Sequence, residues 1–516
     1  MKFANGYKAL SLAVIAGLAT TTAQAAGLDR SGQDVTAFLQ DGTYAEAVYT
    51  YIDTDISGHD NAAAGGASTA DQYVKGNATG NISETYDFFR YGVKADINDR
   101  FSVGVLYDEP FGAAVQHTDG GTSNFISQGG DAAVASLTGR VPTLAIAKQS
   151  LAQLQAGFTG LQQIQAGLTQ IQAGIAAATA ANNTAQLTAL QAQAAALQAQ
   201  AAAITQQITT ATNTTNLQQA QAVATSLGGA ANAAATAEAQ KGQGTNVEIR
   251  THNATLLLGA KFGANRNFQV YGGPAAQRLT GEVHLRGTAY QATTGYDARI
   301  SPDTKTGWVA GVAYSKPEIA LKAALTYRSA IEHSSEISEV FPALGAAGVT
   351  TRDFSVTLPE SYNFDFQTGV NPTTLLTAKV RYVPWSQFSI DPPTYGDATA
   401  LRNNGVPLSI VSYDKDQWSG EIGLGKKIND KLSLAGNVGY DSGAGNPATS
   451  LGPIKGYYSV GLGAKYNVTP EWSVSLGGKY LKFGDAEAVL PNGAKVAEFE
   501  KNDGYIAGLK LAYQAK

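Results

Sequence analysis

The chain has 516 residues, no cysteine, a net charge of −5 at pH 7 and 15% charged residues, together with 57 glycines and 24 tyrosines. Without cysteine there is no disulfide framework, and the sequence carries no basic patch of the kind that binds nucleic acid. Beyond residue 25 no run of 18 apolar residues occurs, which excludes membrane-spanning helices, whereas low charge with many tyrosines is typical of strands that face lipid.

The first 25 residues predict a secretory signal peptide. Lys2 and Lys8 form a basic region, residues 9–18 are apolar, and Ala23-Gln24-Ala25 offers small residues for cleavage. The apolar stretch is too short to span a bilayer as a helix, and the alternative interpretation is a buried N-terminal helix. We expect the mature chain to begin at Ala26.

Alternation of apolar and polar residues predicts a long series of strands. In the last of them Tyr505, Leu509 and Tyr513 share one face. Fourteen such segments are expected, at 45–57, 84–98, 101–117, 245–263, 268–290, 305–315, 319–334, 350–370, 373–390, 414–428, 431–445, 454–467, 471–486 and 503–514. Tight turns alternate with longer connections, as in outer-membrane barrels, whose tight turns lie in the periplasm. The expected fold is all-β, a 14-stranded antiparallel transmembrane β-barrel over residues 45–516.

Residues 130–244 interrupt this pattern between strands 3 and 4. From Gln149 to Ala237 there is no charged residue. Apolar residues at spacings of three and four form two stripes, from Leu151 to Ile175 and from Leu187 to Ile208, separated by Asn182-Asn183. We therefore expect an inserted α-helical hairpin outside the cell. It is either a self-packed stalk or an uncharged surface that collects hydrophobic solute.

Strand 3 carries a second irregularity. Its alternation runs through Val103, Val105 and Tyr107 and then meets Glu109-Pro110-Phe111-Gly112. Proline cannot donate a ladder hydrogen bond and glycine permits unusual backbone angles. The four residues therefore predict either a local break that opens a lateral gap in the wall or an ordinary bulge near the outer end of the strand.

The chain shows no catalytic or metal-binding motif. The five histidines are scattered, without metal-ligand spacing or a nucleophile motif, so we expect no enzyme and no cofactor. Alternation, with a bulge at Gly272-Gly273 that sends Leu279, Val283 and Leu285 outward, predicts a set of cations facing the lumen. They are Arg278, Arg286, Lys322, Arg328, Lys379 and Arg381. An inward arginine either binds a carboxylate bidentately or pairs with a lumenal acid.

Short segments across most of the chain form an ordered series. They are Ala47-Val48-Tyr49, Asp53 to Gly58, Ile97 to Phe101, Tyr271 to Pro274, Leu325 to Ser329, Trp385 to Phe388, and Leu462-Gly463. In this order, and together with fourteen strands, they resemble the FadL family of outer-membrane transporters (OMPP1/FadL/TodX). Each segment alone is short, but their shared order makes the resemblance specific.

The resemblance implies a barrel plugged by an N-terminal hatch, here residues 26–44, and a kink in strand 3 at Gly112. It implies passive uptake of hydrophobic compounds, most of all long-chain fatty acids, which bind at outer loops, enter an apolar lumenal site and leave sideways at the kink. We expect a monomer in the Gram-negative outer membrane with a periplasmic N-terminus. Beside its solutes, the expected partners are outer-membrane lipid, lipopolysaccharide, periplasmic chaperones and the barrel-assembly machinery.

The sequence departs from the family pattern in three places. The hatch is shorter and lacks an Asn-Pro-Ala motif, the outer loop after strand 5 is short (residues 291–304), and Gln514-Ala515-Lys516 follow the last aromatic residue, Tyr513. Two alternative functions stay open. A general diffusion porin requires an intact strand 3 and a lumen lined by charge, and a surface adhesin would use the helical hairpin with the barrel as its anchor.

Overall fold

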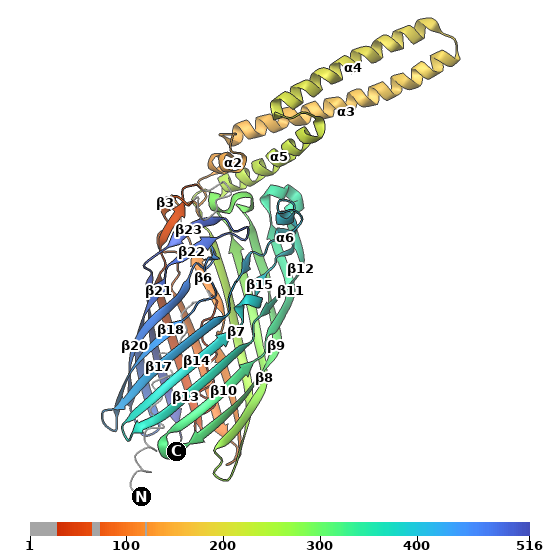
Figure 1. Cartoon of the computed structure of the whole chain (residues 1–516). Helices are drawn as coiled ribbons and strands as arrows, with labels where there is room; N and C mark the ends of the chain where they lie inside the picture. Colours follow the sequence, from red (N-terminus) through yellow and green to blue (C-terminus); the bar gives the residue numbers. More distant parts are fainter. Residues whose placement is uncertain (1–27, 64–72, 119–120, 516) are drawn as a thin grey trace.

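The computed structural model describes residues 28–63, 73–118 and 121–515, so the expected signal peptide lies outside the described residues. Seventeen strands form one antiparallel sheet (Figure 1). The sheet is closed because β1 (Tyr44–Asp55) pairs on one edge with β24 (Asp503–Gln514) and on the other with β4 (Tyr86–Asp96). Closure leaves the wall without a free edge, which is the condition for a sheet to span a membrane.

The other strands of the sheet complete the wall. In chain order they are β5 (Phe101–Asp108), β6 (Gly112–Gln116), β7 (Asn246–Phe262), β8 (Phe268–His284), β9 (Asp297–Lys316), β10 (Leu321–Arg328), β11 (Ile331–Val340), β12 (Val349–Leu358), β13 (Ser361–Asn371), β14 (Thr374–Val383), β17 (Gln417–Lys427), β18 (Leu432–Asp441), β20 (Lys455–Asn467) and β21 (Trp472–Gly484). Three crossings consist of two strands each: β5 with β6, β10 with β11, and β12 with β13. The wall therefore has the fourteen crossings that the alternation predicts.

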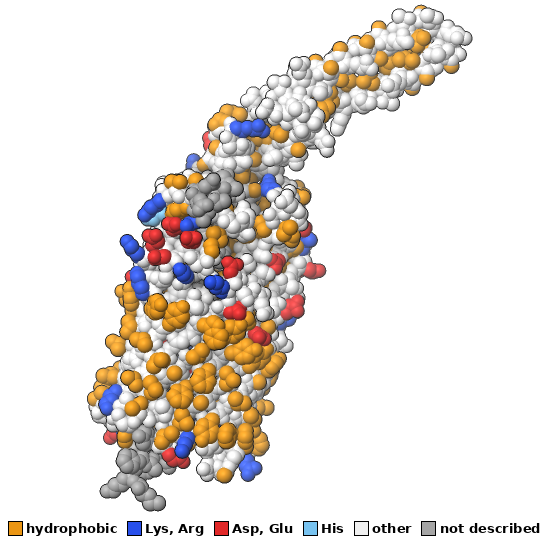
Figure 2. Space-filling view, in the orientation of Figure 1, with side chains coloured by type: hydrophobic (Ala, Val, Ile, Leu, Met, Phe, Trp, Pro, Cys, Tyr) orange, Lys and Arg blue, Asp and Glu red, His pale blue; other side chains and the backbone are white. Residues whose placement is uncertain are grey.

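Burial follows the predicted alternation. In β24, Tyr505, Leu509 and Leu511 are exposed, whereas Ile506 and Lys510 between them are buried. Apolar side chains gather in a broad band around the lower part of the barrel, and charged side chains lie mainly above it (Figure 2). This band is the surface that contacts lipid.

A row of aromatic rings marks the outer border of the band. Trp308, Tyr327, Tyr362, Tyr382 and Trp418 follow one another on adjacent strands, with ring centroids 4.6–6.0 Å apart. A second row near the opposite turns includes the pairs Phe262–Phe268, Phe268–Tyr314 and Trp472–Tyr513. Two such rows are typical of the two interfaces of an outer-membrane barrel.

One predicted register is wrong. β7 and β8 pair in one register on both sides of Gly272-Gly273, from Thr255↔Ala275 to Leu258↔Gly272, so no bulge changes the alternation there. Leu279, Val283 and Leu285 are therefore buried inside, and Arg278 is exposed on the outer face. The predicted strand 6 is also too short, because β9 already begins at Asp297.

The outer end of the barrel is closed by loops with their own structure. A five-stranded sheet joins β2 (Gly58–Asn61), β3 (Lys75–Ala78), β19 (Ala448–Thr449), β22 (Ala486–Val489) and β23 (Lys495–Phe499). Other outer elements are β15 (Ser389–Ile390), β16 (Val411–Ser412), α6 (Pro393–Ala400), η2 (Thr288–Thr293), η4 (Pro342–Gly348) and η5 (Trp385–Gln387), and η3 (Pro317–Ile319) lies in a tight turn. Their apolar side chains extend the core of the outer lumen.

A helical arm projects from the outer end (Figure 1). It contains the two expected helices, α3 (Leu144–Ala180) and α4 (Thr184–Thr212), and also α2 (Gly130–Thr138) and α5 (Leu217–Ala239), which connect them to the barrel. The turn between α3 and α4 ends at Asn183, whose side chain accepts a hydrogen bond from the Gln186 amide and caps α4. Among the described residues, none of the helices has both the length and the apolar character needed to cross a bilayer.

The two apolar stripes of the arm face each other. Gly157, Gly167 and Gly174 of α3 lie against Ile208, Leu197 and Leu190 of α4. Leu154 and Ile208 are buried in the same contact. The stripes therefore pack the hairpin on itself and leave Gln, Ala and Thr at its surface.

Because the apolar band faces lipid, we expect a charge introduced there to lower the stability of the protein by an amount that depends on its position. Leu462 is 72% exposed and lies on β20 midway between Tyr458 and Tyr466, so Leu462→Arg places a cation in the middle of the apolar band. We expect it to lower the free energy of unfolding in lipid by about 2–4 kcal/mol. Urea titration of tryptophan fluorescence in liposomes measures this loss. Thr357→Arg, on an exposed position paired with Glu332 above the band, is the matched control and is expected to be nearly neutral.

Candidate functional site

An N-terminal segment, residues 28–43, lies inside the barrel. Val35 and Phe38 are fully buried, and the ring of Phe38 lies 5.7 Å from that of Tyr271 on β8. The Asp34 side chain accepts a hydrogen bond of 2.6 Å from the Thr36 amide, which stabilises the turn that begins there. Apolar contact and a local turn thus hold the segment in the lumen.

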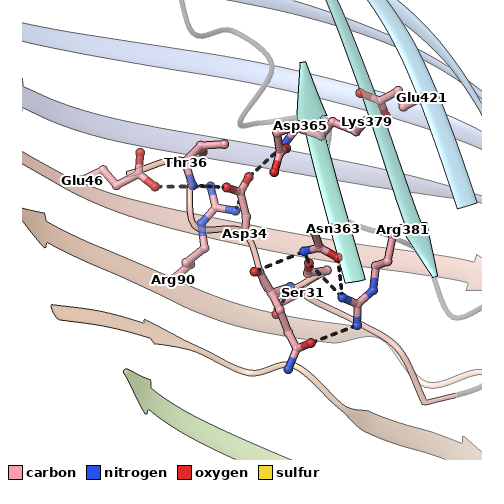
Figure 3. Close-up of polar contacts among 12 residues, drawn as sticks. Ser31, Asp34, Thr36, Glu46, Arg90, Asn363, Asp365, Lys379, Arg381 and Glu421 are labelled. Atoms are coloured by element: carbon pink, nitrogen blue, oxygen red, sulfur yellow. Dashed lines mark hydrogen bonds and ion pairs between the residues drawn. The ribbon is translucent and has the colours of Figure 1, made fainter. Parts of the chain in front are cut away.

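Two acids of this segment are paired with cations of the barrel wall, and Figure 3 shows one of them, Asp34, between Lys379 and Arg90. Asp29 binds Arg381 on β14 through two contacts, Nε–Oδ2 at 2.7 Å and Nη2–Oδ1 at 3.1 Å. Asp34 lies 2.9 Å from the Lys379 ammonium and 3.3 Å from the Arg90 guanidinium. Burial alone would raise the pKa of the Asp34 carboxyl, but Lys379 and Arg90 hold that pKa well below its usual value.

The structure places four of the six predicted lumenal cations in contact with the segment or beside it. Besides Lys379 and Arg381, Lys322 donates to the Leu39 carbonyl, and Arg328 donates to Thr255 Oγ1 at 3.2 Å and to the Gln33 carbonyl at 3.4 Å. All four are inside the barrel and contact groups of the protein itself.

The other two cations lie elsewhere. The inward orientation predicted for Arg278 is wrong, because the strand keeps its register through Gly272-Gly273 and Arg278 falls on the exposed face. Arg286 follows the end of β8 at the outer end of the barrel, where it donates to Asp297 at 2.6 Å and to the Tyr296 carbonyl at 3.2 Å. Neither residue contributes to the lumenal site.

Strand 3 is interrupted where the sequence places Glu109-Pro110-Phe111-Gly112. β5 ends at Asp108 and β6 begins at Gly112. β4 pairs with β5 only up to Tyr91↔Tyr107, and contact between strands 2 and 3 resumes at the bridge Ser83↔Val115. In the described chain, the two strands therefore lack direct backbone pairing between Tyr107 and Ala114 of strand 3, whose carbonyl accepts from the Glu84 amide.

The N-terminal segment fills this gap from inside. The Gly112 amide donates to the Leu28 carbonyl, the Arg30 amide donates to the Pro110 carbonyl, both at 2.8 Å, and Asp29 forms a bridge with Phe111. A Cβ on Gly112 would lie 2.8 Å from the Ile249 carbonyl oxygen and 2.9 Å from Arg30 Nε. The kink residue must be glycine because the backbone of β7 and the Arg30 side chain of the segment both pack directly on it.

Arg30 is buried inside the gap. Its Nε donates to the Gly112 carbonyl at 2.6 Å, and its guanidinium carbon lies 3.1 Å from the centre of the Tyr86 ring. Burial lowers the pKa of Arg30 to about 10, so the side chain remains a cation at neutral pH. Nη1 and Nη2 have no hydrogen-bond partner among the described residues. The guanidinium is thus held by stacking and by a single hydrogen bond.

The lumen changes polarity at the level of the gap. Its outer half is filled by one apolar cluster that includes Phe111, Val383 and Trp385, with the Phe111 and Trp385 rings 5.5 Å apart in an edge-to-face arrangement. Below lie charged groups, among them the pair Lys479–Glu421 at 2.6 Å. The described residues contain no cluster of His, Cys, Asp and Glu suited to a metal ion. The outer lumen is therefore packed with apolar side chains above a level of fixed charge.

A closed barrel with an interrupted, internally plugged wall and an apolar outer lumen defines a membrane channel for hydrophobic solutes. Residues 150–514 match the family described as Outer membrane protein transport protein (OMPP1/FadL/TodX), and the chain belongs to this family. The family consists of outer-membrane transport channels for hydrophobic compounds, not of enzymes. This agrees with the resemblance of the sequence and places the protein in the Gram-negative outer membrane.

Solved structures share the fold at low sequence identity. A Pseudomonas aeruginosa FadL homologue is 14% identical with a TM-score of 0.56, and the match covers 96% of each chain. The toluene transporter TodX of P. putida is 10% identical with a TM-score of 0.51, covering 97% of each chain. A comparison with curated proteins gives no match. These likenesses establish the architecture, and the solute must be argued from this chain's own residues.

Three residues of the site were missed by the sequence reasoning: Asp29, Arg30 and Asp34. One signal was available, because three charged residues within six positions are conspicuous in a chain of low charge. Lumenal cations such as Arg381 also require counter-charges, and the N-terminal segment is the nearest supply. The partners are separated by 352 positions, so no local pattern connects them.

The close approach at the kink predicts that a single methyl group is harmful there. Gly112→Ala brings its Cβ against a backbone oxygen that cannot rotate away, and we expect a loss of about 1–3 kcal/mol in the free energy of unfolding. Gly425→Ala is the matched control, since its Cβ would meet nothing closer than 3.9 Å. Equal stability of the two variants in a detergent–urea titration would contradict the contact.

Proposed function

We propose that the protein takes up long-chain fatty acids passively and releases them sideways through the gap in strand 3. The solute enters at the outer loops, which carry the helical arm, and passes into the apolar outer half of the lumen. It leaves through the wall beside Phe111 and Gly112. The observation that carries the proposal is that the apolar cluster of the lumen ends at this gap and rests on a layer of charge.

The charged layer opposes axial passage of an apolar chain. To continue toward the periplasm, the chain would have to separate buried ion pairs such as Asp34–Lys379 and Lys479–Glu421. Breaking a buried pair leaves an uncompensated charge, at a cost of about 3–5 kcal/mol for each pair. Displacement of the stretch around Asp29 from the gap separates one ion pair, Asp29–Arg381, and opens a route to the lipid past Phe111. The sideways route is therefore favoured.

The gap also lies at a suitable height in the membrane. Tyr107, two residues before Glu109, belongs to the outer aromatic row: its ring lies 5.8 Å from that of Tyr91, and its hydroxyl hydrogen-bonds His252 at 2.7 Å. A solute leaving just beyond this row reaches the interfacial part of the outer leaflet. There an amphiphile keeps its headgroup in polar surroundings while its chain enters the hydrocarbon.

Cations at the inner end of the apolar cluster favour a solute with an anionic headgroup. Arg381 lies two residues from the buried Val383, and Arg30 lies within the gap itself. The solved toluene transporter shows that this architecture also accepts a neutral aromatic compound in that protein. Guanidinium groups beside an apolar site are complementary to a fatty acid, whereas toluene has no group for them to bind.

A general diffusion porin is less compatible with these features. It requires an intact strand 3 and an open, charge-lined lumen, whereas β5 and β6 are separated and the lumen holds residues 28–43.

The adhesin alternative concerns the helical arm alone. Deleting residues 130–244 tests it: an adhesin loses its partner, whereas the proposed transporter retains at least some fatty-acid uptake.

A reversible lock across the gap tests lateral release. The chain has no native cysteine, and Asp29 and Phe111 face each other as a bridge pair, for which Cα atoms are typically about 4.5–5.5 Å apart, within disulfide range. In the variant Asp29→Cys/Phe111→Cys we expect the oxidised protein to take up labelled oleate no faster than protein-free liposomes, and reduction to restore uptake. The two single variants should not respond to reductant. Equal uptake before and after reduction would exclude the gap as the exit.

A further inference from the structure

The carboxylate of Asp29 occupies the position that a fatty-acid headgroup would take on Arg381. The guanidinium holds both carboxylate oxygens, at 2.7 Å and 3.1 Å, in the forked geometry that arginine forms with any free carboxylate. The third side of the guanidinium is held by Asn363, whose Oδ1 lies 2.8 Å from Nη1. Arg381 is therefore a formed carboxylate site that is occupied by a residue of the protein itself.

The site can be reached from the apolar region. Arg381, Lys379 and Asn363 line a cavity next to the N-terminal segment, together with Tyr457, which belongs to the apolar cluster of the outer lumen. Val383, on the same face of β14 one alternation further out, is fully buried in that cluster. An amphiphile with its chain among these apolar groups thus brings its headgroup to Arg381.

We propose that Arg381 is a carboxylate-exchange site, at which the headgroup of the substrate displaces Asp29 and thereby releases the segment that closes the gap. The inference rests on lateral release. It adds that the substrates that open the gap are amphiphiles with a carboxylate. During exchange one carboxylate replaces another, so Arg381 is never left without a counter-charge. The exchange therefore avoids the large cost of an unpaired buried ion.

The coupling between site and gap is direct because consecutive residues do both. Asp29 binds the far wall, whereas its neighbours Leu28 and Arg30 hydrogen-bond the broken strand on the near wall through Gly112 and Pro110. When Asp29 leaves Arg381, the stretch from Leu28 to Arg30 loses its ion pair to β14. Residues 32–34 stay bound to Asn363, Arg381 and Lys379, so only this stretch is released, and there the hydrogen bonds across the gap remain.

Arg30 lowers the stability of the closed state. Its Nη1 and Nη2 are buried without a hydrogen-bond partner among the described residues, and such donors carry an uncompensated desolvation cost. Opening the gap lets these nitrogens meet water or the departing carboxylate. Opening of the gap thus gives Arg30 the hydrogen-bond partners that its Nη1 and Nη2 lack in the closed state. This gain offsets part of the loss of the Asp29–Arg381 pair, so the closed state is sensitive to competition for Arg381.

Hydrogen–deuterium exchange tests the inference on the purified full-length mature protein in detergent. The Arg30 and Gly112 amides donate across the gap, so their exchange rates report its opening. With laurate as probe, we expect these rates to rise about tenfold or more, the effect of weakening the closed state by roughly 1.4 kcal/mol. Dodecanol, which has the same chain without the carboxylate, should leave them unchanged.

Substitutions separate the exchange from a general loosening of the segment. Asp29→Asn should exchange fast without ligand and gain nothing from laurate, and Arg381→Gln should behave in the same way. Asp34→Asn is the matched control: it removes the other acid, which pairs with Lys379 and Arg90, and should retain the response to laurate.

The outcomes also distinguish this inference from the proposed function. An equal effect of laurate and dodecanol, no effect of either, or a wild-type rate in Asp29→Asn overturns carboxylate exchange. If the disulfide across the gap nevertheless stops oleate uptake, lateral release stands and only the exchange is wrong. If that disulfide leaves uptake unchanged, the exit itself is wrong, whatever the amide rates show.

Discussion

A sheet that crosses lipid must satisfy every backbone N–H and C=O group, because the hydrocarbon offers no partner. A break in such a wall is possible only where something else supplies the missing hydrogen bonds. In this protein the supply comes from inside the barrel, where Leu28 and Arg30 bond the strand at Gly112 and Pro110. The N-terminal segment is therefore a part of the wall as well as a plug. Any movement that frees the segment also opens the wall.

The segment is attached at both sides of the barrel. On one side its acids bind Lys379 and Arg381 of β14, and on the other its backbone completes strand 3, next to Arg90 of β4. The first set of contacts is electrostatic and can be contested by another anion, whereas the second is a short run of backbone hydrogen bonds. Between them lies Arg30, two of whose nitrogens have no hydrogen-bond partner in the part of the chain that the structure describes. Under the proposed exchange, this combination makes the closed state sensitive to competition for the Asp29–Arg381 pair.

Under the proposed function, the distribution of polarity sets the direction of transport. Apolar side chains from loops and strands fill the outer lumen, and ion pairs fill the level beneath it. An apolar chain gains free energy in the first region and would lose it in the second. The helical arm stands apart from this path: its apolar stripes are used in the contact between α3 and α4, which supports the interpretation as a self-packed stalk.

Local patterns in the sequence were sufficient to predict the strands, the helical hairpin and the break at residues 109–112. Alternation with a period of two, spacing of three and four, and a proline followed by glycine each act through nearest neighbours, so they can be read without the fold. The α2 and α5 helices also lie within residues 130–244, but the sequence analysis did not distinguish them from the hairpin.

Contacts between distant parts of the chain were decided only by the tertiary structure. The face of Arg278 depends on how β7 and β8 pair around Gly272-Gly273, which no single strand reveals. The cations Lys379 and Arg381 were recognised as lumenal, but the acids that bind them lie more than 300 positions away. Sequence determines which groups enter the lumen, since alternation is local. Which of them meet is determined by closure of the barrel, which brings the N-terminal segment against the strands of both walls.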